Sequence, residues 1–184
     1  ISGADSRRWV HQLRAGCDAV IVGGGTVRAD DPLLTSRGRR DPEPLRVVLS
    51  RGLDLPAEAQ LWDTASAATL VAHGPEAACK QAPNGPERLE LEQCEPLPLM
   101  QHLAARGCNQ VLWECGSELA AAAIRQGCVQ EVAAVLAPKL MGGPAARTPL
   151  GELGFTAMDQ VLCGQLLPPR PIGDDWLLSL RLGG

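Results

Sequence analysis

Two glycine-bearing turns, each directly after a short apolar run, have the residue types of a phosphate-binding site. The first turn is Gly23–Thr26 after the run 18–22, and the second is Glu114–Ser117 after the run 110–113. Each pattern predicts a buried strand, a tight turn and the start of a helix, with unpaired backbone N–H groups at the sheet edge. Two such turns in one small chain predict a phosphorylated cofactor.

The two turns differ in what they permit. Gly23 and Gly25 match the first two glycines of the common dinucleotide-binding fingerprint, but Arg28 stands where the third glycine is required. A tight turn without a ligand explains that segment equally well. In the second turn, Gly116 permits close approach of the backbone to a diphosphate, and Ser117 is a candidate cap for the following helix.

Ser50 and Arg51 directly follow a third apolar run, 45–49. A hydroxyl and a guanidinium at this point favour a cofactor with a 2′-phosphate, as in NADP, whereas an acid there favours NAD. A solvated strand end is the alternative interpretation of these two residues.

Charged residues near the turns are candidates for substrate contacts. Glu114 ends a strand, where open α/β sheets bind ligands, so its carboxylate is suited to hold a donor group; helix capping is the alternative. Arg14 and Arg37 are candidate clamps for a substrate phosphate. Asp30 and Asp31 are expected to fix their loop through side-chain to backbone hydrogen bonds or to orient a ligand.

The elements that must position these residues alternate between strands and helices. Helices are expected over 4–15, 26–29, 99–106 and 118–126, and strands over 18–22, 45–49, 69–72, 88–91, 111–113 and 131–136. The tail, 160–167 and 176–182, is expected to pair as an antiparallel hairpin. This order predicts an α/β fold in three layers (α/β/α), with a mostly parallel central sheet and an antiparallel C-terminal hairpin at its edge.

Composition narrows the classes of partner. The 184 residues, 45% of them hydrophobic, suffice for one domain with a core, and no apolar run approaches the length of a membrane span. A net charge of −4 argues against nucleic acid as the main partner. The chain starts at Ile1 and enters a helical pattern at once, so an internal start is expected, with an earlier segment left out.

The cysteines predict reduced thiols in a cytoplasmic compartment. The seven cysteines contain no CxxC pair and the three histidines lack zinc-ligand spacing, which argues against a metal site. Cys115 is expected to be a packing residue rather than a nucleophile, because no histidine stands near it in sequence.

Two blocks of sequence resemble the reductase domain of the bifunctional riboflavin-biosynthesis deaminase–reductase. The first block contains His11-x-Leu13-Arg14-Ala15, Asp18–Gly23, Gly25-Thr26-Val27 and Asp30-Asp31-Pro32-Leu33-Leu34-Thr35-x-Arg37. The second contains Trp113-Glu114-x-Gly116, Glu131-Val132 and Ala137–Gly143. Both blocks occur in order over residues 1–143, while the last forty or so residues match loosely.

The resemblance implies a dihydrofolate-reductase-like fold over residues 1–184, with NADPH as hydride donor. The implied reaction reduces the ribosyl group of 5-amino-6-(5-phosphoribosylamino)uracil to a ribityl chain, without a metal, and Glu114 or a bound water is the candidate acid. The implied cofactor contacts are Thr26, Asp30, Ser50, Gly116, Ser117, Glu118, Leu119, Ala120, Ala121 and Ala122, and the implied substrate contacts are Arg14, Leu34, Arg37 and Glu114. A homodimer, formed through the C-terminal hairpin, and an upstream zinc deaminase domain are also implied.

The chain departs from the family pattern in three places. The family has a lysine-bearing strand before the position of Ile1, an acid where Trp9 stands, and often a small residue or proline where Ser117 stands. Two alternatives therefore remain open. One is a pteridine-type reductase of the same fold, against which Arg14 and Arg37 argue; the other is a non-catalytic NADP-binding domain.

Overall fold

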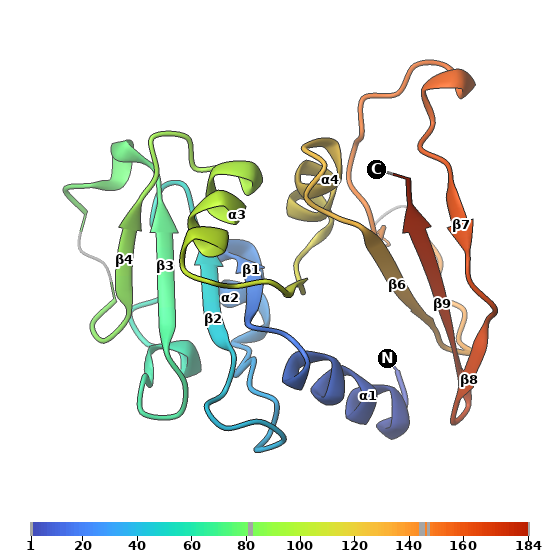
Figure 1. Cartoon of the computed structure of the whole chain (residues 1–184), viewed down its shortest axis with the longest axis horizontal. Helices are drawn as coiled ribbons and strands as arrows, with labels where there is room; N and C mark the ends of the chain where they lie inside the picture. Colours follow the sequence, from blue (N-terminus) through green and yellow to red (C-terminus); the bar gives the residue numbers. More distant parts are fainter. Residues whose placement is uncertain (1, 81–82, 144–145, 147, 184) are drawn as a thin grey trace.

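The computed structural model describes residues 2–80, 83–143, 146 and 148–183, and its strands form two sheets (Figure 1). The larger sheet has the order β4-β3-β2-β1-β5 and is parallel throughout. Its strands are β1 Ala19–Gly23, β2 Leu45–Leu49, β3 Thr69–His73, β4 Glu87–Glu90 and β5 Val111–Trp113. Because parallel strands are covered on both faces, the central strand β1 is a continuous apolar run rather than an alternating one, and Ala19–Val22 are fully buried.

Helices cover both faces of this sheet. The helices are α1 Ala4–Ala15, α2 Gly24–Asp30, α3 Pro96–Ala105 and α4 Ser117–Arg125, with 3-10 turns η1 Gln60–Trp62, η2 Pro75–Ala77 and η3 Met158–Gln160. Ile21 belongs to the same core cluster as Leu99 of α3, whereas its neighbour Val20 belongs to a second cluster with Val27 of α2. The three-layer α/β/α expectation is therefore confirmed.

The antiparallel strands form a second sheet. Its strands are β6 Glu131–Leu136, β7 Gly164–Leu166, β8 Arg170–Ile172 and β9 Asp175–Leu182, and the first three all pair with β9. The expected C-terminal hairpin is confirmed by the pairing of Leu166 with Leu180. The expected position of this hairpin at the edge of the parallel sheet is wrong. The hairpin belongs to the second sheet, where β6 pairs with β9 over six residues, from Glu131↔Arg181 to Leu136↔Trp176.

Several boundaries differ from the expected ones. α2 starts at Gly24, directly after β1, rather than at Thr26. α3 starts at Pro96, three residues before the expected start at Leu99. Proline is tolerated at the first helical position, because the N–H that it lacks would have no partner within the helix. β7 has three residues instead of eight: η3 includes Gln160, and Pro168 and Pro169 follow soon after the strand and lack N–H donors.

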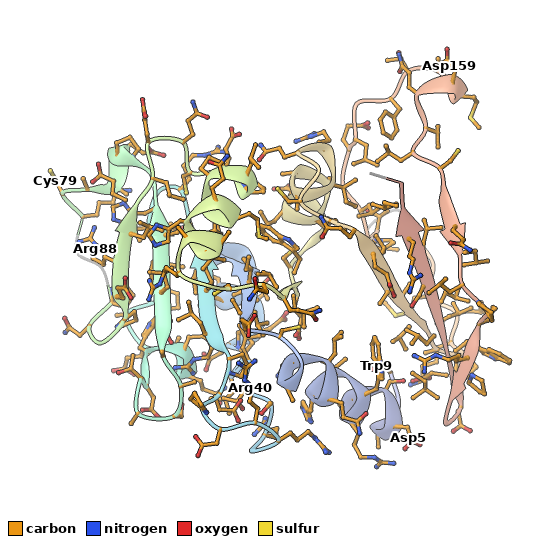
Figure 2. All side chains as sticks on the ribbon, viewed as in Figure 1. Asp5, Trp9, Arg40, Cys79, Arg88 and Asp159 are labelled. Carbon is orange, nitrogen blue, oxygen red and sulfur yellow. The ribbon has the colours of Figure 1, made fainter. Side chains whose placement is uncertain are left out.

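One buried carboxylate joins the two ends of the chain. Asp175, at the start of β9, accepts hydrogen bonds from the Gly3 backbone N–H at 2.7 Å and the Ser6 hydroxyl at 2.5 Å. The hydroxyl of Ser6, and then the N–H of Gly3, hold the pKa of Asp175 below its usual range. Figure 2 shows Asp5 and Trp9 on the part of α1 nearest the antiparallel sheet. The tail thus packs against the start of α1.

Candidate active site

The carboxyl ends of β2, β1 and β5 lie next to one another, since these strands are neighbours in the sheet. Gly23 pairs with Leu49, so the turn after β1 lies beside Ser50, and the Glu114 N–H continues the ladder by donating to the Ile21 carbonyl at 2.9 Å. The two glycine-bearing turns and the serine, which come from three separate parts of the sequence, therefore meet at one sheet edge. Ligands of open α/β folds bind at this edge.

Glycines allow the backbone segments at this edge to approach closely. A Cβ on Gly24 would lie 2.9 Å from the Ser50 hydroxyl oxygen, closer than real Cβ atoms come, so any larger residue there would displace the Ser50 side chain. A Cβ on Gly116 would lie 3.9 Å from the Thr26 hydroxyl oxygen, so the second turn is next to the first. The expected cofactor residues Thr26, Ser50 and Gly116 therefore lie near one another.

A bidentate ion pair links α1 to the end of β5. Arg14 donates from Nε and Nη2 to the two carboxylate oxygens of Glu114, at 2.8 and 2.6 Å. Its Nη1 donates to the Thr35 carbonyl at 2.9 Å. The Arg14 side chain is 11% exposed and that of Glu114 34%, so water screens the pair only partly. Arg14 thereby orients Glu114 and ties the loop after α2 to both of them.

The loop after α2 presents arginines on a strained backbone. Leu34, which is buried, and Arg37, which is exposed, both have left-handed backbone conformations, with φ of +57° and +60°. Such a conformation costs a non-glycine residue on the order of 1 kcal/mol, so the surroundings must hold it in place. The Glu43 carboxylate does so by accepting the N–H groups of Ser36 at 2.6 Å and Gly38 at 2.9 Å.

His11 shows that these charges share one region. Burial lowers the pKa of His11, and the positive charges of Arg14, Arg37 and Arg39 lower it further against the opposing effect of Glu114. His11 is therefore neutral at pH 7 and lies within electrostatic reach of all three arginines. Arg14, Arg37 and Arg39 thus lie near His11, and they outnumber the two carboxylates close to them, Glu114 and Glu43. This balance favours a phosphate group.

The remaining expected site residues lie on α2 and α4. Asp30 is exposed at the end of α2, while Asp31 accepts the Gln60 N–H at 2.8 Å and so fixes the loop as expected. Glu118–Ala122 form the first turns of α4, where Ala121 is buried and can offer only its backbone. The expected cap by Ser117 is wrong: Gly116 occupies the cap position without a side-chain hydrogen bond, because Ser117 is already the first helical residue.

Sequence reasoning missed two charged residues that hold loops in place, Glu43 and Arg46. Glu43 is one of several charged residues in a polar loop, and nothing in the amino-acid sequence distinguishes it from the others. Arg46 is fully buried in β2 and donates to five carbonyls, those of Leu33, Gln60, Leu61, Asp63 and Ala67. A charged residue inside an otherwise apolar parallel strand was the available signal, since a buried guanidinium needs several acceptors.

The cysteines of the chain are unpaired, and no cluster of metal-binding side chains occurs in the described residues. The seven cysteines are unpaired, and burial raises the pKa of Cys115 to about 11, as expected of a packing residue. Among the residues that the structure describes, no three His, Cys, Asp or Glu side chains gather in a group able to hold a metal ion. In the same residues, every helix is too short or too polar to cross a bilayer.

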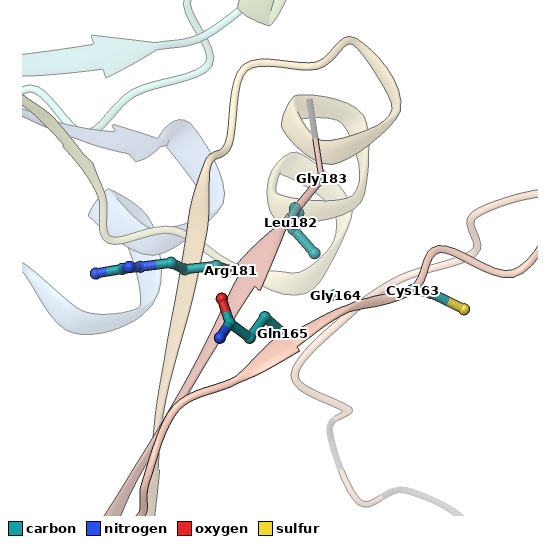
Figure 3. A pocket seen from close by; sticks show the side chains of 6 residues that line it. All are labelled: Cys163, Gly164, Gln165, Arg181, Leu182 and Gly183. Carbon is teal, nitrogen blue, oxygen red and sulfur yellow. The ribbon is translucent and has the colours of Figure 1, made fainter.

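A hollow lies elsewhere, at the ends of β7 and β9 (Figure 3). Its lining residues are Cys163, Gly164, Gln165, Arg181, Leu182 and Gly183. None of the expected site residues lines it, and Arg181 is paired with Glu131 at 3.5 Å. The carboxyl ends of the strands, where Thr26, Ser50 and Gly116 lie near one another, are therefore the better candidate for the active site.

The fold is that of an α/β domain with glycine-bearing turns at the carboxyl ends of two neighbouring parallel strands. Residues 1–178 match the RibD C-terminal domain, and the chain belongs to that family. It is 53% identical to the riboflavin biosynthesis protein RibD of Synechocystis sp., covering 100% of this chain and 51% of that protein. It is 29% identical to the 2,5-diamino-6-ribosylamino-4(3H)-pyrimidinone 5′-phosphate reductase of Methanothermobacter thermautotrophicus, covering 100% of this chain and 88% of that protein.

A solved structure agrees with these sequence relatives. The structure of Acinetobacter baumannii RibD (form 1) superposes with a TM-score of 0.82 at 29% identity, covering 100% of this chain and 52% of that one. The resemblance inferred from the two sequence blocks is thus confirmed at the level of family and fold. The chain spans about half the length of the RibD proteins it matches.

Proposed function

We propose that this domain catalyses the NADPH-dependent reduction of the ribosyl group of 5-amino-6-(5-phosphoribosylamino)uracil to a ribityl chain. The observation that carries the proposal is the Arg14–Glu114 pair, which joins the glycine-bearing turn after β5 to the arginine-bearing loop through the Thr35 carbonyl. Membership of the RibD C-terminal domain family favours this reaction over that of a pteridine-type reductase.

The residues at the sheet edge fit a nicotinamide cofactor. A Cβ on Gly25 would meet only the end of the Arg28 side chain, at 4.0 Å, so the turn after β1 leaves room beside its backbone. Thr26 and the first turn of α4, Gly116–Leu119, are suited to hold the diphosphate through hydroxyl and unpaired N–H groups, whereas the Ala120 N–H already donates to the Gly116 carbonyl; Asp30 is exposed at the end of α2. Ser50 and the exposed Arg51 are placed to bind a 2′-phosphate. When bound, NADPH supplies the hydride.

The second group of residues is suited to bind the substrate. Arg37 is exposed and donates no hydrogen bond within the described part of the chain, so its guanidinium is available for the sugar phosphate. Glu114, oriented by Arg14, is suited to accept hydrogen bonds from the heterocycle or its amino groups. The side chain of Leu34 packs in the core with Val22 and Val27, so Leu34 can meet the substrate only through its backbone. Together these contacts would align the acceptor carbon and exclude water.

The pairing of Glu114 bears on the source of the proton. An ionised carboxylate that accepts two N–H groups of one guanidinium has no proton to give. We therefore assign Glu114 to substrate positioning and the protonation of the substrate nitrogen to water.

An assay of hydride transfer tests the proposal. The protein, as this chain and as any longer natural polypeptide that carries it, is mixed with NADPH and the phosphoribosylamino-uracil. Loss of the reduced-nicotinamide absorbance and appearance of the ribityl product are expected. Binding of both compounds without turnover would instead support the non-catalytic NADP-binding alternative, and absence of binding would contradict both functions.

The outer face of the antiparallel sheet supports a homodimer as part of this proposal. Asp175 and Leu177 are buried on the side of α1, so the alternate residues of β9 face the other way. On that outer face Trp176 is 48% exposed and its partner Leu136 59% exposed, and Leu166 adds a third apolar side chain at 60%. A lysine in place of Leu136 is expected to shift the mass measured by light scattering from dimer to monomer; an unchanged mass would reject this interface.

The lengths of the RibD relatives are the basis for a proposal about the full-length protein. Because the matched RibD proteins are about twice the length of this chain, we propose an upstream deaminase domain with its own zinc in the full-length protein. The seven unpaired cysteines fit a cytoplasmic location. Sequencing of the complete transcript tests the first point, and fractionation of cells that express the protein tests the second.

A further inference from the structure

The backbone around Arg37 is held from the opposite side by one acidic side chain. The two carboxylate oxygens of Glu43 accept the N–H groups of Ser36 and Gly38, the residues immediately before and after Arg37. The Ser36 hydroxyl in turn accepts the N–H groups of Arg39 and Arg40, at 3.1 and 3.2 Å. The turn is thus closed by side chains rather than by a regular ladder.

This arrangement explains how Arg37 keeps its left-handed conformation. Both Arg37 and Gly38 have positive φ, +60° and +74°, and the N–H groups of Ser36 and Gly38 converge on the same carboxylate. An anion bound to these N–H groups offsets the conformational cost, and Glu43 supplies it from within the chain. Although burial alone would raise the pKa of Glu43, the hydrogen bonds from Gly38 and Ser36 lower it, so the carboxylate stays charged.

The direction of the Arg37 side chain follows from the same contacts. Glu43 occupies the N–H side of the turn, and no hydrogen bond or ion pair joins it to the Arg37 guanidinium in the part of the chain that the structure describes. Arg37 is instead within electrostatic reach of His11, together with Arg14 and Arg39. Glu43 therefore fixes the backbone of Arg37 without neutralising its charge at short range.

We infer that Glu43 is a positioning residue for substrate binding, which holds Arg37 toward the phosphate of the substrate. The inference rests on the proposed phosphate-binding role of Arg37. Glu43 itself touches neither substrate nor cofactor; it reduces the backbone freedom that Arg37 would otherwise lose on binding. Its loss weakens the ground state and the transition state alike, so KM changes and kcat does not.

The variant Glu43→Gln tests this inference, because an amide has only one acceptor oxygen for the two N–H groups. The KM for the phosphorylated substrate is expected to rise roughly tenfold, with kcat and the KM for NADPH within about twofold of the wild type. The KM for the same substrate without its phosphate is expected to stay unchanged. Hydrogen exchange at the amides of residues 36 and 38 is expected to speed up. Glu90→Gln, an exposed glutamate of β4, is the control and is expected to change none of these values.

A double-mutant cycle separates this inference from the proposed function. Glu43→Gln is expected to have no further effect on KM in an Arg37→Ala background. An equal rise in KM with and without Arg37 would overturn the positioning role. A rise for Arg37→Ala but none for Glu43→Gln would overturn only this inference, whereas no rise for Arg37→Ala would overturn the phosphate-binding role of Arg37 as well. If Glu43→Gln does not fold, Glu43→Asp replaces it, because its shorter carboxylate reaches only one of the two amides. A smaller rise in the KM for the phosphorylated substrate is then expected. An unchanged KM would count against the inference.

Discussion

Replacing Glu114 by glutamine tests the central contact of the site. The amide keeps the size of the side chain but removes its charge, and its NH2 group opposes one of the two N–H groups that Arg14 donates. The stability of the domain should fall because the ion pair with Arg14 is lost, and the activity should fall because a substrate contact is weakened.

The structure sets the size of both effects. Exposed ion pairs contribute about 0–1 kcal/mol, and removing one partner of a buried pair costs about 3–5 kcal/mol. Arg14 is 11% exposed and Glu114 34%, so the free energy of unfolding should fall between these limits, by about 1–3 kcal/mol. A lost hydrogen bond from the substrate to a charged acceptor costs about 1.5–3 kcal/mol, which corresponds to a kcat/KM about 10- to 150-fold lower.

Urea unfolding measures the first quantity and NADPH oxidation the second. Glu87→Gln is the matched control, because Glu87 forms a bidentate pair with Arg106 at 2.8 and 3.0 Å, more exposed and at the far strand β4. That variant should lose less than about 1 kcal/mol of stability and no activity. Equal loss of activity in both variants would refute the reasoning. A changed shape of the pH–kcat profile in Glu114→Gln would show that Glu114 donates the proton.

Three further predictions follow from single residues. Arg51→Ala should raise the KM for NADPH roughly tenfold and leave that for NADH unchanged, as measured by initial rates, because only NADPH carries the 2′-phosphate; equal effects on both cofactors would contradict this role. The folded-state pKa of Asp175 is lowered, so the contribution of its carboxylate to stability is present at neutral pH and disappears as the pH falls through that pKa. The difference in the free energy of unfolding between wild type and Asp175→Asn should therefore shrink below about pH 4. A difference that does not change with pH would contradict this prediction. Because burial raises the pKa of Cys115 to about 11, iodoacetamide at about pH 8 should alkylate the exposed Cys79 well before Cys115, as read by peptide mass spectrometry; faster labelling of Cys115 would show that it is accessible and reactive.

Much of the fold could be predicted because its signals are local. The apolar runs that end at Gly23, Ser50 and Glu114 each lie within a few residues of the turn that follows, and all three are strands in the structure. The pairing partner of the strand 131–136 could not be predicted from neighbouring residues, because an apolar run of six residues fits the edge of either sheet. Ser117 was assigned as a cap because the exact start of a helix depends on the backbone before it.

The candidate site was predictable in its residue types but not in its contacts. Arg14, Arg37 and Glu114 were expected near the substrate. Their hydrogen bonds were not: Arg14 donates to Glu114 and to the Thr35 carbonyl, and its expected contact with the substrate stays a prediction. Glu43 had no signal at all, since its two N–H donors are recognisable only once the loop is folded.

The amino-acid sequence by itself determined the strands, the glycines that end them and the family, because hydrophobic periodicity and turn chemistry act over a few neighbouring residues. The tertiary structure decided which of those ends meet. Arg14 and Glu114 are 100 positions apart and come together only because β5 lies beside β1 in the sheet. That order follows from the packing of whole elements around a shared core, where many weak contacts are optimised at once, and no short stretch of residues records the result.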